Sequence, residues 1–573
     1  MRPAAARTPA AWIAVAALVA LAAVALPAEA ASRAPVVGPR GMVVAPERAA
    51  AEAGSAVLRR GGNAIDAAIA TAFALAVTYP RAGNLGGGGF LLYRAPDGAH
   101  AALDFRETAP FALRPAMFRD ASGKIDPAKS RSGGLAVGVP GSVAGLAEAH
   151  ARWGSRPWAE LLAPAIELAE AGVVVSPQSA ARYAEENARL ATDPAARAIF
   201  TRDGAPLPEG ARLVQKDLAK TLRAIAASGP KGFYEGSVAE AIVEGVAAAG
   251  GVMTREDLAG YRAVPREPLV GSYRGRTVVS FPLPSSGGIV LLQALAMLER
   301  FDLASSGAGS SLTLHRIAEA LRRAFADRSR YLGDPDQVRV PVEALLAPDY
   351  VKRRGATIRD DRATPSSKVR PGLPDRPEGG QTLHLSVADA RGGAVALTTT
   401  LNSRFGAALV APGTGVLLNN EVDDFALGAG VANQFGLVGE DANAPAGGKR
   451  PLSSMCPTIV ESREGGRPLL VLGSPGGATI ISSVLQTIVH VIDDGMSLQE
   501  AVDAPRIHHQ WLPDTILHEP RALPADVAAG LTARGHTLTQ RDFIGNVCAI
   551  GLDASGRWTG APDSREEAVA IGY

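Results

Sequence analysis

A polar, proline-rich segment at residues 348–380 divides the chain into two parts with different hydrophobic patterns, and this change restricts the fold more than any other feature. Apolar residues recur mainly with a helical period before the segment and mainly with a strand period after it. Helices are expected at 46–79 with a break at Gly61 and Gly62, in much of 141–260, at 312–332 and at 480–492; strands are expected at 90–94, 101–105, 382–388, 394–401, 416–418, 458–461 and 469–472. Helices layered on sheets follow from this distribution.

The dividing segment has the composition of an exposed, flexible linker in which chain cleavage is tolerated. It leads into the sequence GGQTLHLSV, residues 379–387. Thr382, His384 and Ser386 fall on one face of the expected strand, because successive side chains alternate. One interpretation is a solvated strand edge, and the other is that Thr382 becomes a new chain start.

The first thirty residues have the pattern of a cleaved secretory signal. Arg2 and Arg7 precede an apolar run over 11–26, and PAEA ends at Ala30. A retained membrane anchor is the alternative, but the run is short and alanine-rich for a span of about 20 residues. We expect cleavage after Ala30. No second apolar segment of that length appears without charges or helix breakers, so the expected protein is exported and is periplasmic or secreted.

Charge and cysteine content exclude several classes of protein. The chain has 58 Lys plus Arg against 57 Asp plus Glu, which gives no electrostatic footprint for nucleic acid. Cys456 and Cys548 are the only thiols, and two buried free thiols are favoured over a disulfide. No metal-ligand spacing occurs, so neither a metal nor another cofactor is predicted.

Several glycine and serine motifs are ambiguous when each is taken alone. Gly86 to Gly89 can cradle phosphate, but the Lys of a P-loop is missing and close backbone packing is favoured. GSPGG at 473–477 can present backbone N–H groups to an oxyanion or form a tight turn. The serine pairs in PSSGG (284–288) and LSSM (452–455) can cap turns.

Charged residues near expected strand ends offer a second group of candidates. Arg106 can grip a carboxylate with its guanidinium fork, or it can pair with Asp104 or Glu107. Glu421 and Asp424 can hold an ammonium group, or they can belong to a solvated turn.

Taken in order, these motifs resemble one family, the γ-glutamyltranspeptidases, also called glutathione hydrolases. The resemblance covers about 45–573 and rests on NAIDAA, GNLGGGGF, DFRE, PSSGG, QTLHLSV, TTTLNSRFG, GVLLNNEVDDF, GKRPLSSM, SPGG and DAPRIHHQW. It implies an α+β fold, a four-layer αββα sandwich of the N-terminal nucleophile hydrolase type. It also implies self-cleavage between Gln381 and Thr382, which would yield a large subunit of residues 31–381 and a small subunit of residues 382–573 that form a heterodimer.

The resemblance further implies that the hydroxyl of Thr382 takes the γ-glutamyl group of glutathione and related compounds and passes it to water or to amino acids and peptides. An α-amino group next to that hydroxyl can serve as the base. The implied site residues are Thr382 and Thr400 at the nucleophile, Gly476 and Gly477 at the oxyanion hole, Arg106, Ser453 and Ser454 for the substrate carboxylate, and Asn402, Glu421 and Asp424 for the substrate ammonium.

Two positions depart from the family pattern. Leu383 stands where many members have a second Thr, and Phe435 stands where a Tyr is frequent in the lid loop. His508 and His509 belong to the motif set, and we expect them to pack and to form hydrogen bonds. Two alternatives stay open: a cephalosporin or glutaryl acylase of the same fold, and a binding protein that is not processed.

Overall fold

The computed structural model describes residues 32–370, 383–428, 431, 433–434, 441–463 and 466–573, and residues 35–573 form one compact unit. The expected signal (1–30), the scissile pair Gln381 and Thr382, and Phe435 lie outside the described residues. In the part of the chain that is described, no helix has the length and apolar character needed to cross a membrane.

Two seven-stranded antiparallel sheets form the centre of the unit. The first, called here the β12 sheet, has the order β23 (Val569–Gly572), β2 (Met42–Ala45), β12 (Leu383–Ala388), β13 (Ala394–Thr400), β3 (Gly88–Arg94), β4 (His100–Phe105) and β9 (Val264–Arg266). The second, called the β17 sheet, has the order β1 (Val36–Gly38), β22 (Trp558–Pro562), β21 (Cys548–Leu552), β17 (Pro468–Gly473), β16 (Thr458–Glu461), β11 (Arg276–Ser280) and β10 (Leu269–Tyr273). The sheets pack face to face through β2, β12 and β13 against β17, β21 and β22.

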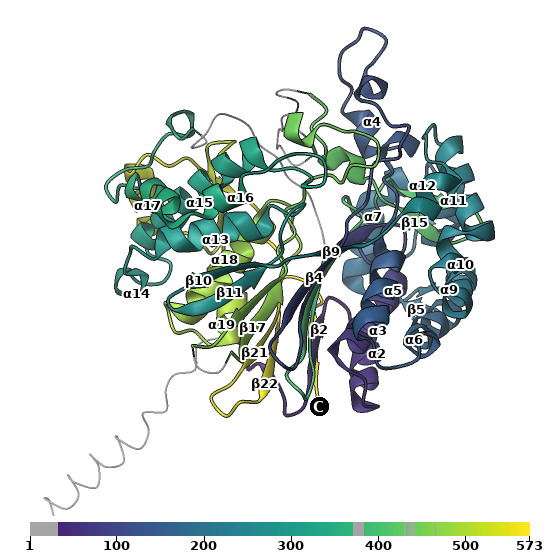
Figure 1. Ribbon diagram of the computed structural model, residues 1–573, viewed down its shortest axis with the longest axis horizontal. Helices are drawn as coiled ribbons and strands as arrows, with labels where there is room; N and C mark the ends of the chain where they lie inside the picture. Colours follow the sequence, from purple (N-terminus) through teal and green to yellow (C-terminus); the bar gives the residue numbers. More distant parts are fainter. Residues whose placement is uncertain (1–31, 371–382, 429–430, 432, 435–440, 464–465) are drawn as a thin grey trace, which may run out of the picture. The chain divides into compact units, whose positions relative to one another are not determined.

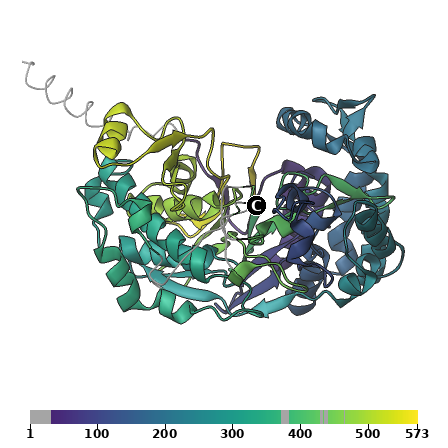
Figure 2. The same ribbon diagram turned by 90° about the horizontal axis from the view of Figure 1, so that it is seen from above.

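Helices cover the outer face of each sheet (Figure 1; Figure 2). The β12 sheet is covered by α2 (Arg48–Arg59), α3 (Ala64–Thr78) and α5 (Ser142–Trp153), with α6 (Trp158–Ala171) and α9 (Lys216–Ser228) outside them. The β17 sheet is covered by α13 (Gly287–Leu298), α18 (Thr479–Ile492) and α19 (Leu498–Asp503), with α15 (Ser311–Tyr331) packed on α13. The expected α+β class and four-layer αββα arrangement are confirmed.

The remaining elements lie around this sandwich. The helices are α4 (Ala128–Arg131), α7 (Pro177–Leu190), α8 (Pro194–Phe200), α10 (Lys231–Tyr234), α11 (Gly236–Ala248), α12 (Arg255–Gly260), α14 (Leu303–Ser306), α16 (Val342–Leu346), α17 (Pro348–Ala356) and α20 (Ala525–Ala533). The strands are β5 (Val173–Val174), β6 (Thr201–Arg202), β7 (Ala205–Pro206), β8 (Arg212–Leu213), β14 (Leu409–Ala411), β15 (Val416–Leu418), β18 (Ile507–His508), β19 (Ile516–His518) and β20 (Leu538–Gln540).

Local sequence explains where the first two helices begin and end. Gly61 has φ of 87° and follows α2, a conformation that glycine adopts without a steric penalty. Asn63 and Asp66 then form a capping box that starts α3. Every residue of α3 is buried, because the helix is apolar on nearly all sides and lies between the β12 sheet and α6. The predicted break at Gly61 and Gly62 is confirmed.

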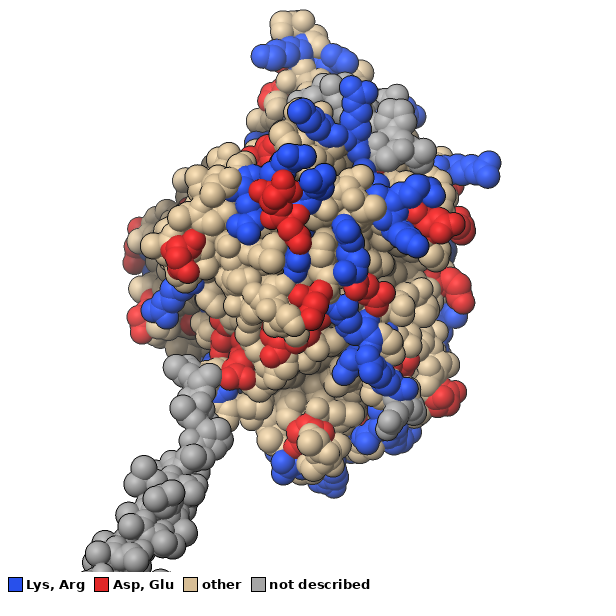
Figure 3. All heavy atoms as spheres, turned by 90° about the vertical axis from the view of Figure 1, so that its left-hand side faces the viewer, with Lys and Arg blue, Asp and Glu red and all other residues tan. Residues whose placement is uncertain are grey.

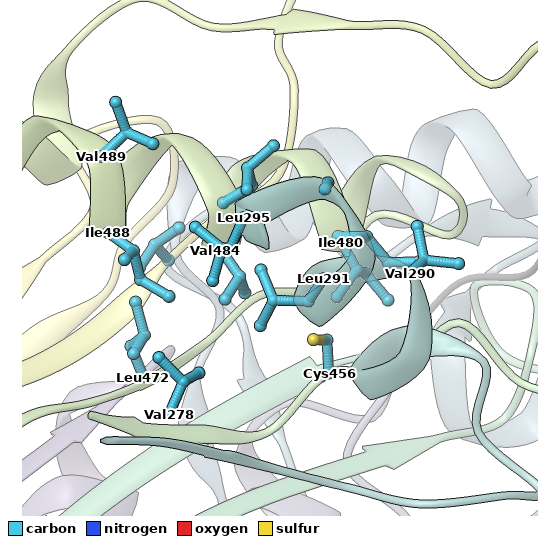
Figure 4. Packing of buried hydrophobic residues seen from close by; sticks show 14 of the residues in the cluster. Val278, Val290, Leu291, Leu295, Cys456, Leu472, Ile480, Val484, Ile488 and Val489 are labelled. Carbon is cyan, nitrogen blue, oxygen red and sulfur yellow. The ribbon is translucent and has the colours of Figure 1, made fainter. Parts of the chain in front are cut away.

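The core beyond the β17 sheet is formed by α13 and α18 (Figure 4). Leu291 and Leu295 of α13 and Val484 and Ile488 of α18 lie in one cluster with strand residues such as Leu472. Burying side chains of this size contributes roughly 1.5–3 kcal/mol each. The strand and helix thereby fix the position of the glycine turn that joins β17 to α18.

The polar face of β12 lies between the two sheets, so the interpretation of a solvated strand edge is wrong. Ser386 Oγ donates to the carbonyl oxygens of Val471 and Cys548 at 3.1 and 3.0 Å. His384 lies 2.8 Å from Thr398 Oγ1 through Nδ1 and 3.1 Å from Ser386 Oγ through Nε2. Burial lowers the pKa of His384 to about 3, so the ring is neutral. The strand therefore carries polar groups that pair with the facing sheet.

The expectation of a flexible linker is wrong for its first part. Residues 348–370 include α17 and pack against α15, with Val351, Ile358 and Val369 in the core. Arg323 of α15 donates to Thr357 O at 2.9 Å, and Arg316 pairs with Asp360 at 2.7 Å. Composition indicated exposure, but buried arginines of α15 need these carbonyl and carboxylate oxygens as partners.

Surface charge agrees with the balanced composition. Figure 3 shows Lys and Arg side chains interspersed with Asp and Glu on the face that it presents. Such mixing produces no strong field of one sign on that face. Cys456 and Cys548 are buried and free, as expected, and burial raises the pKa of Cys456 to about 11.

Candidate active site

Several predicted site residues lie at one edge of the β12 sheet because antiparallel register brings strand ends together. Leu383 at the start of β12 pairs with Thr399, which also pairs with Gly89 of β3. Gly89 in turn pairs with Phe105 at the end of β4, directly before Arg106. The end of β13 and the residue after β4 therefore meet beside the first described residue after the expected scissile bond.

Arg106 is buried with three carboxyl groups. Its Nη1 lies 2.5 Å from Glu421 Oε1 and 3.7 Å from Glu107 Oε2, and its Nη2 lies 2.5 Å from Asp424 Oδ2. Nε donates to the carbonyl oxygen of Pro451 at 3.2 Å. The side chain of Arg106 is 1% exposed, so the pairs are shielded from water. The sequence analysis treated the local ion pair of Arg106 and the ligand site as alternatives. In the structure, Arg106 lies beside the local partner Glu107 and beside Glu421 and Asp424.

Burial sets the protonation of this cluster. Burial raises the pKa of Glu107 to about 7 and raises the pKa values of Glu421 and Asp424 well above the ordinary range, although Arg106 opposes the shift. Burial also disfavours charge on Arg106, but Glu421, Asp424 and Glu107 outweigh it and raise the pKa of Arg106. One cation thus faces more acidic groups than it can neutralise. A ligand that carries both a cation and an anion can bind here: its anion pairs with Arg106, and its cation pairs with the acidic groups. No buried charge is then left without a partner of opposite sign.

The two serine motifs form one structure. Ser285 and Ser453 form a bridge between PSSGG and LSSM, and Ser453 N donates to Pro284 O at 2.9 Å. Arg328 of α15 donates to Ser286 Oγ at 2.7 Å and to Ser454 Oγ at 2.8 Å. Leu452 O, directly before Ser453, accepts from Arg106 Nη2 at 3.3 Å. The serine loop is therefore held against both the α15 layer and the Arg106 cluster.

Thr400 and Asn402 occupy the turn after β13. Asn402 N donates to Thr400 Oγ1 at 2.7 Å, and Asn402 Nδ2 donates to Asn420 O at 2.9 Å. Asn402 has φ of 71°, and its buried Oδ1 has no hydrogen-bond partner among the described residues. A Cβ on Gly87 would lie 2.0 Å from Thr400 O, so this glycine lets the loop before β3 approach the turn. The prediction that the glycine run serves close backbone packing is confirmed.

Gly476 and Gly477 lie in the turn between β17 and α18. Their φ values are 130° and 64°, a region that favours glycine. Gly476 O accepts from Thr479 N at 3.2 Å and from Thr479 Oγ1 at 2.7 Å. The turn leads into α18, whose N-terminus favours negative charge. The interpretation of GSPGG as a tight turn is confirmed, and the oxyanion-hole role of Gly476 and Gly477 stays a prediction.

A cavity of about 350 Å³ brings Thr400, Asn402 and Gly476 together. Arg106, Glu421, Asp424 and the serine pair are buried and do not line it. Side chains that the sequence interpretation did not select also line the cavity: Tyr79, Arg81, Asn546 and Glu566. Arg81 lies two residues before the GNLGGGGF motif, whereas Glu566 lies far from every motif named above, and nothing in the sequence indicated that the two side chains meet. Thr382 lies outside the described residues, so its predicted role remains a prediction.

The chain is similar in sequence and in structure to known proteins on both sides of the segment 348–380. A sequence model of the family described as gamma-glutamyltranspeptidase matches residues 50–573. The glutathione hydrolase proenzyme of Escherichia coli is 46% identical over 543 residues, which are 94% of this chain and 93% of that protein. The cephalosporin acylase from Bacillus halodurans superposes with a TM-score of 0.84 at 30% identity, covering 95% of this chain and 98% of its own. The Helicobacter pylori gamma-glutamyltranspeptidase superposes with a TM-score of 0.57 at 44% identity, covering 59% of this chain and 97% of its own.

Proposed function

Since the chain belongs to the γ-glutamyltranspeptidase family, we propose that it is an exported, self-processing enzyme that cleaves the γ-glutamyl amide of glutathione and related compounds. It passes the γ-glutamyl group to water or to the amine of an amino acid or peptide. The expected signal at residues 1–30 supports export to the periplasm or the medium. The mature enzyme would then be a heterodimer of residues 31–381 and 382–573.

The single observation that carries this proposal is the buried cluster of Arg106, Glu421 and Asp424. A γ-glutamyl group carries an α-carboxylate and an α-ammonium. On binding, the α-carboxylate would form an ion pair with the guanidinium of Arg106 and would accept hydrogen bonds from Ser453 and Ser454. The ammonium would bind the carboxylates of Glu421 and Asp424 and the Oδ1 of Asn402, which has no hydrogen-bond partner among the described residues. Each buried charge keeps a partner of opposite sign throughout, which is the condition for burying a zwitterion.

The proposed chemistry uses the new amino terminus. Scission of the 381–382 bond frees the α-amine of Thr382, whose usual pKa is roughly 7.7–8.0, so it can accept the proton of the adjacent hydroxyl. The hydroxyl oxygen attacks the γ-carbonyl carbon, and the backbone N–H groups of Gly476 and Gly477 stabilise the oxyanion. The proton then moves to the departing amine as the amide C–N bond breaks. Water or an acceptor amine attacks the ester, and Thr382 regains its proton; Thr400 would hold the hydroxyl in position.

Denaturing gel electrophoresis with N-terminal sequencing tests the proposal. Purified protein should give two bands, the smaller one beginning at Thr382, and should release product from γ-glutamyl-4-nitroanilide. Thr382→Ala should give one band and no turnover. Cleavage of Thr382→Ala at the same bond would refute the nucleophile assignment. A single uncut band in the unaltered protein, without turnover, would favour a binding protein that is not processed.

A second function has one observation in its favour, the match to a cephalosporin acylase over 95% of this chain. A glutaryl group lacks the ammonium, so it would leave Glu421 and Asp424 without a ligand cation. We therefore expect higher kcat/KM for γ-glutamyl-4-nitroanilide than for glutaryl-7-aminocephalosporanic acid. The opposite preference would make the acylase the better assignment.

A further inference from the structure

One part of the wall of the 350 Å³ cavity is built around Glu566. Glu566 Oε2 accepts from Tyr79 Oη at 2.7 Å, from Arg81 Nη2 at 3.2 Å and from Asn546 Nδ2 at 3.4 Å. Tyr79 and Arg81 follow α3, whereas Asn546 precedes β21. One carboxylate, whose side chain is 9% exposed, thus fixes side chains from distant parts of the chain on the same wall.

Arg81 is held rigidly but keeps part of its binding capacity. Its Nη2 also donates to Tyr79 Oη at 2.9 Å and to Gln178 Oε1 at 3.0 Å, and the guanidinium lies 4.1 Å from the centre of the Tyr79 ring. The residue is only 5% exposed. Its Nη1 is buried and has no hydrogen-bond partner among the described residues. A buried guanidinium N–H without a partner is costly, and a ligand oxygen would satisfy it.

Asn546 offers the complementary group on the same wall. Its Oδ1 is buried and lacks a hydrogen-bond partner within the described part of the chain, and the residue is 2% exposed. Two residues of this wall therefore carry a cationic donor and a neutral acceptor that have no partner among the described residues, and Glu566 positions both side chains. A carboxylate and an amide or amine N–H are the groups that match them.

The charge of the lining agrees with an anionic ligand. Four guanidinium groups face three carboxylates around the cavity, which leaves one positive charge in excess; the residues are Arg81, Arg182, Arg404 and Arg541 with Glu185, Asp542 and Glu566. Burial lowers the pKa of Arg541, and the positive charge of the neighbouring Arg404 lowers it further. A cavity of this volume is at the lower end of the roughly 300–1,000 Å³ found for small-molecule sites.

From these observations we propose that Arg81 and Asn546 form a subsite for the peptide that leaves, or the peptide that accepts, the γ-glutamyl group. Arg81 Nη1 binds the C-terminal carboxylate of that peptide, and Asn546 Oδ1 accepts from its N–H. Thr400, Asn402 and Gly476 line the same cavity, so the peptide would lie beside the proposed reaction centre. This inference rests on the proposed function. An acceptor amine must approach the acyl-enzyme where the leaving amine departed, so one subsite serves both.

The test compares glutathione with its C-terminal amide, which differs only in the carboxylate, by measuring kcat/KM for release of glutamate. The unaltered enzyme should prefer glutathione, and Arg81→Met should lower the ratio of the two kcat/KM values by about tenfold or more, the usual effect of a lost hydrogen bond to a charged group. Arg81→Lys keeps the positive charge but lacks the forked guanidinium. The ratio of kcat/KM for glutathione to kcat/KM for its C-terminal amide should therefore fall in this variant as well. Arg48→Met on the exposed surface of α2 is the matched control and should leave the ratio unchanged.

The outcomes are distinguishable. An unchanged ratio in Arg81→Met and Arg81→Lys would overturn the subsite, and so would equal turnover of both substrates by the unaltered enzyme. If Arg81→Met does not fold, the ratio measured for Arg81→Lys decides. Absence of turnover of both substrates and of γ-glutamyl-4-nitroanilide by the unaltered, processed protein would instead refute the proposed function.

Discussion

Arg106 is enclosed with three carboxyl groups, and its removal would leave acidic groups buried without a cation. We predict that Arg106→Gln lowers the free energy of unfolding by about 3–5 kcal/mol at pH 8. The loss should be smaller at pH 5, because the raised pKa values let these carboxyl groups take up protons and become neutral. Urea unfolding at both pH values, in a Thr382→Ala background that keeps one chain, measures the difference.

The control for Arg106 is Arg48→Gln, whose side chain is 68% exposed. A surface change of this kind should alter the free energy of unfolding by no more than about 0.5 kcal/mol. A loss in Arg106→Gln that is equal at pH 5 and pH 8 would contradict the assignment of the cluster as the source of the effect.

His384 lies between the sheets as a neutral ring with a pKa of about 3, whereas an unfolded His titrates near 6.5. Below pH 6.5 the imidazole of His384 binds a proton in the unfolded chain but stays neutral in the folded chain. The contribution of His384 is therefore complete above pH 6.5 and is lost toward pH 3, at about 1.4 kcal/mol for each pH unit. His384→Gln should reduce proton uptake on unfolding at pH 5 by about one proton. Equal slopes of unfolding free energy against pH in the two proteins would disprove this.

At the scale of elements, the loop between α3 and β3 shows how a glycine run controls the site. Gly87 allows the loop backbone to approach the end of β13. A Cβ there would lie 2.0 Å from Thr400 O and 2.7 Å from Asn84 Oδ1. Neither atom moves freely, because Asn84 Nδ2 donates to Thr400 O at 2.9 Å and Ser142 Oγ donates to Asn84 Oδ1 at 2.6 Å.

We therefore predict that Gly87→Ala lowers the free energy of unfolding by about 1–3 kcal/mol. It should also lower kcat for γ-glutamyl-4-nitroanilide, because Thr400 must shift. Gly260→Ala is the control, since no atom lies within 4 Å of its added Cβ, and its effect on stability should stay below about 1 kcal/mol. Urea unfolding and steady-state kinetics measure both variants; equal behaviour of the two would show that the approach at Gly87 has no consequence.

At the scale of the whole molecule, both sheets mix strands from the two sides of the expected scissile bond. β2 pairs with β12 and with β23, β3 pairs with β13, and β11 pairs with β16. The fold is of the N-terminal nucleophile hydrolase type, as its match to the cephalosporin acylase and to the Helicobacter pylori enzyme indicates. Cleavage in such an arrangement breaks one peptide bond, and the hydrogen bonds between strands of the two parts of the chain remain.

We predict that the cleaved fragments elute together in native size-exclusion chromatography and separate only under denaturing conditions. Residues 382–573 expressed alone should not fold, because their strands would lack hydrogen-bonded neighbours from the first part. A small fragment that elutes by itself from the native column, with a cooperative unfolding transition, would contradict this.

The amino-acid sequence by itself determined many of the helices and strands and the break at Gly61 and Gly62, because side-chain periodicity and capping act over a few residues. It did not predict β10, β11 or α17. Ordered motifs also indicated the family. Tertiary structure alone decided that Arg106 pairs with Glu421 and Asp424, that residues 348–370 pack on the arginines of α15, and that Arg81 and Asn546 share a wall through Glu566. The partner of a buried charge comes from residues hundreds of positions away, and only packing that excludes water selects it.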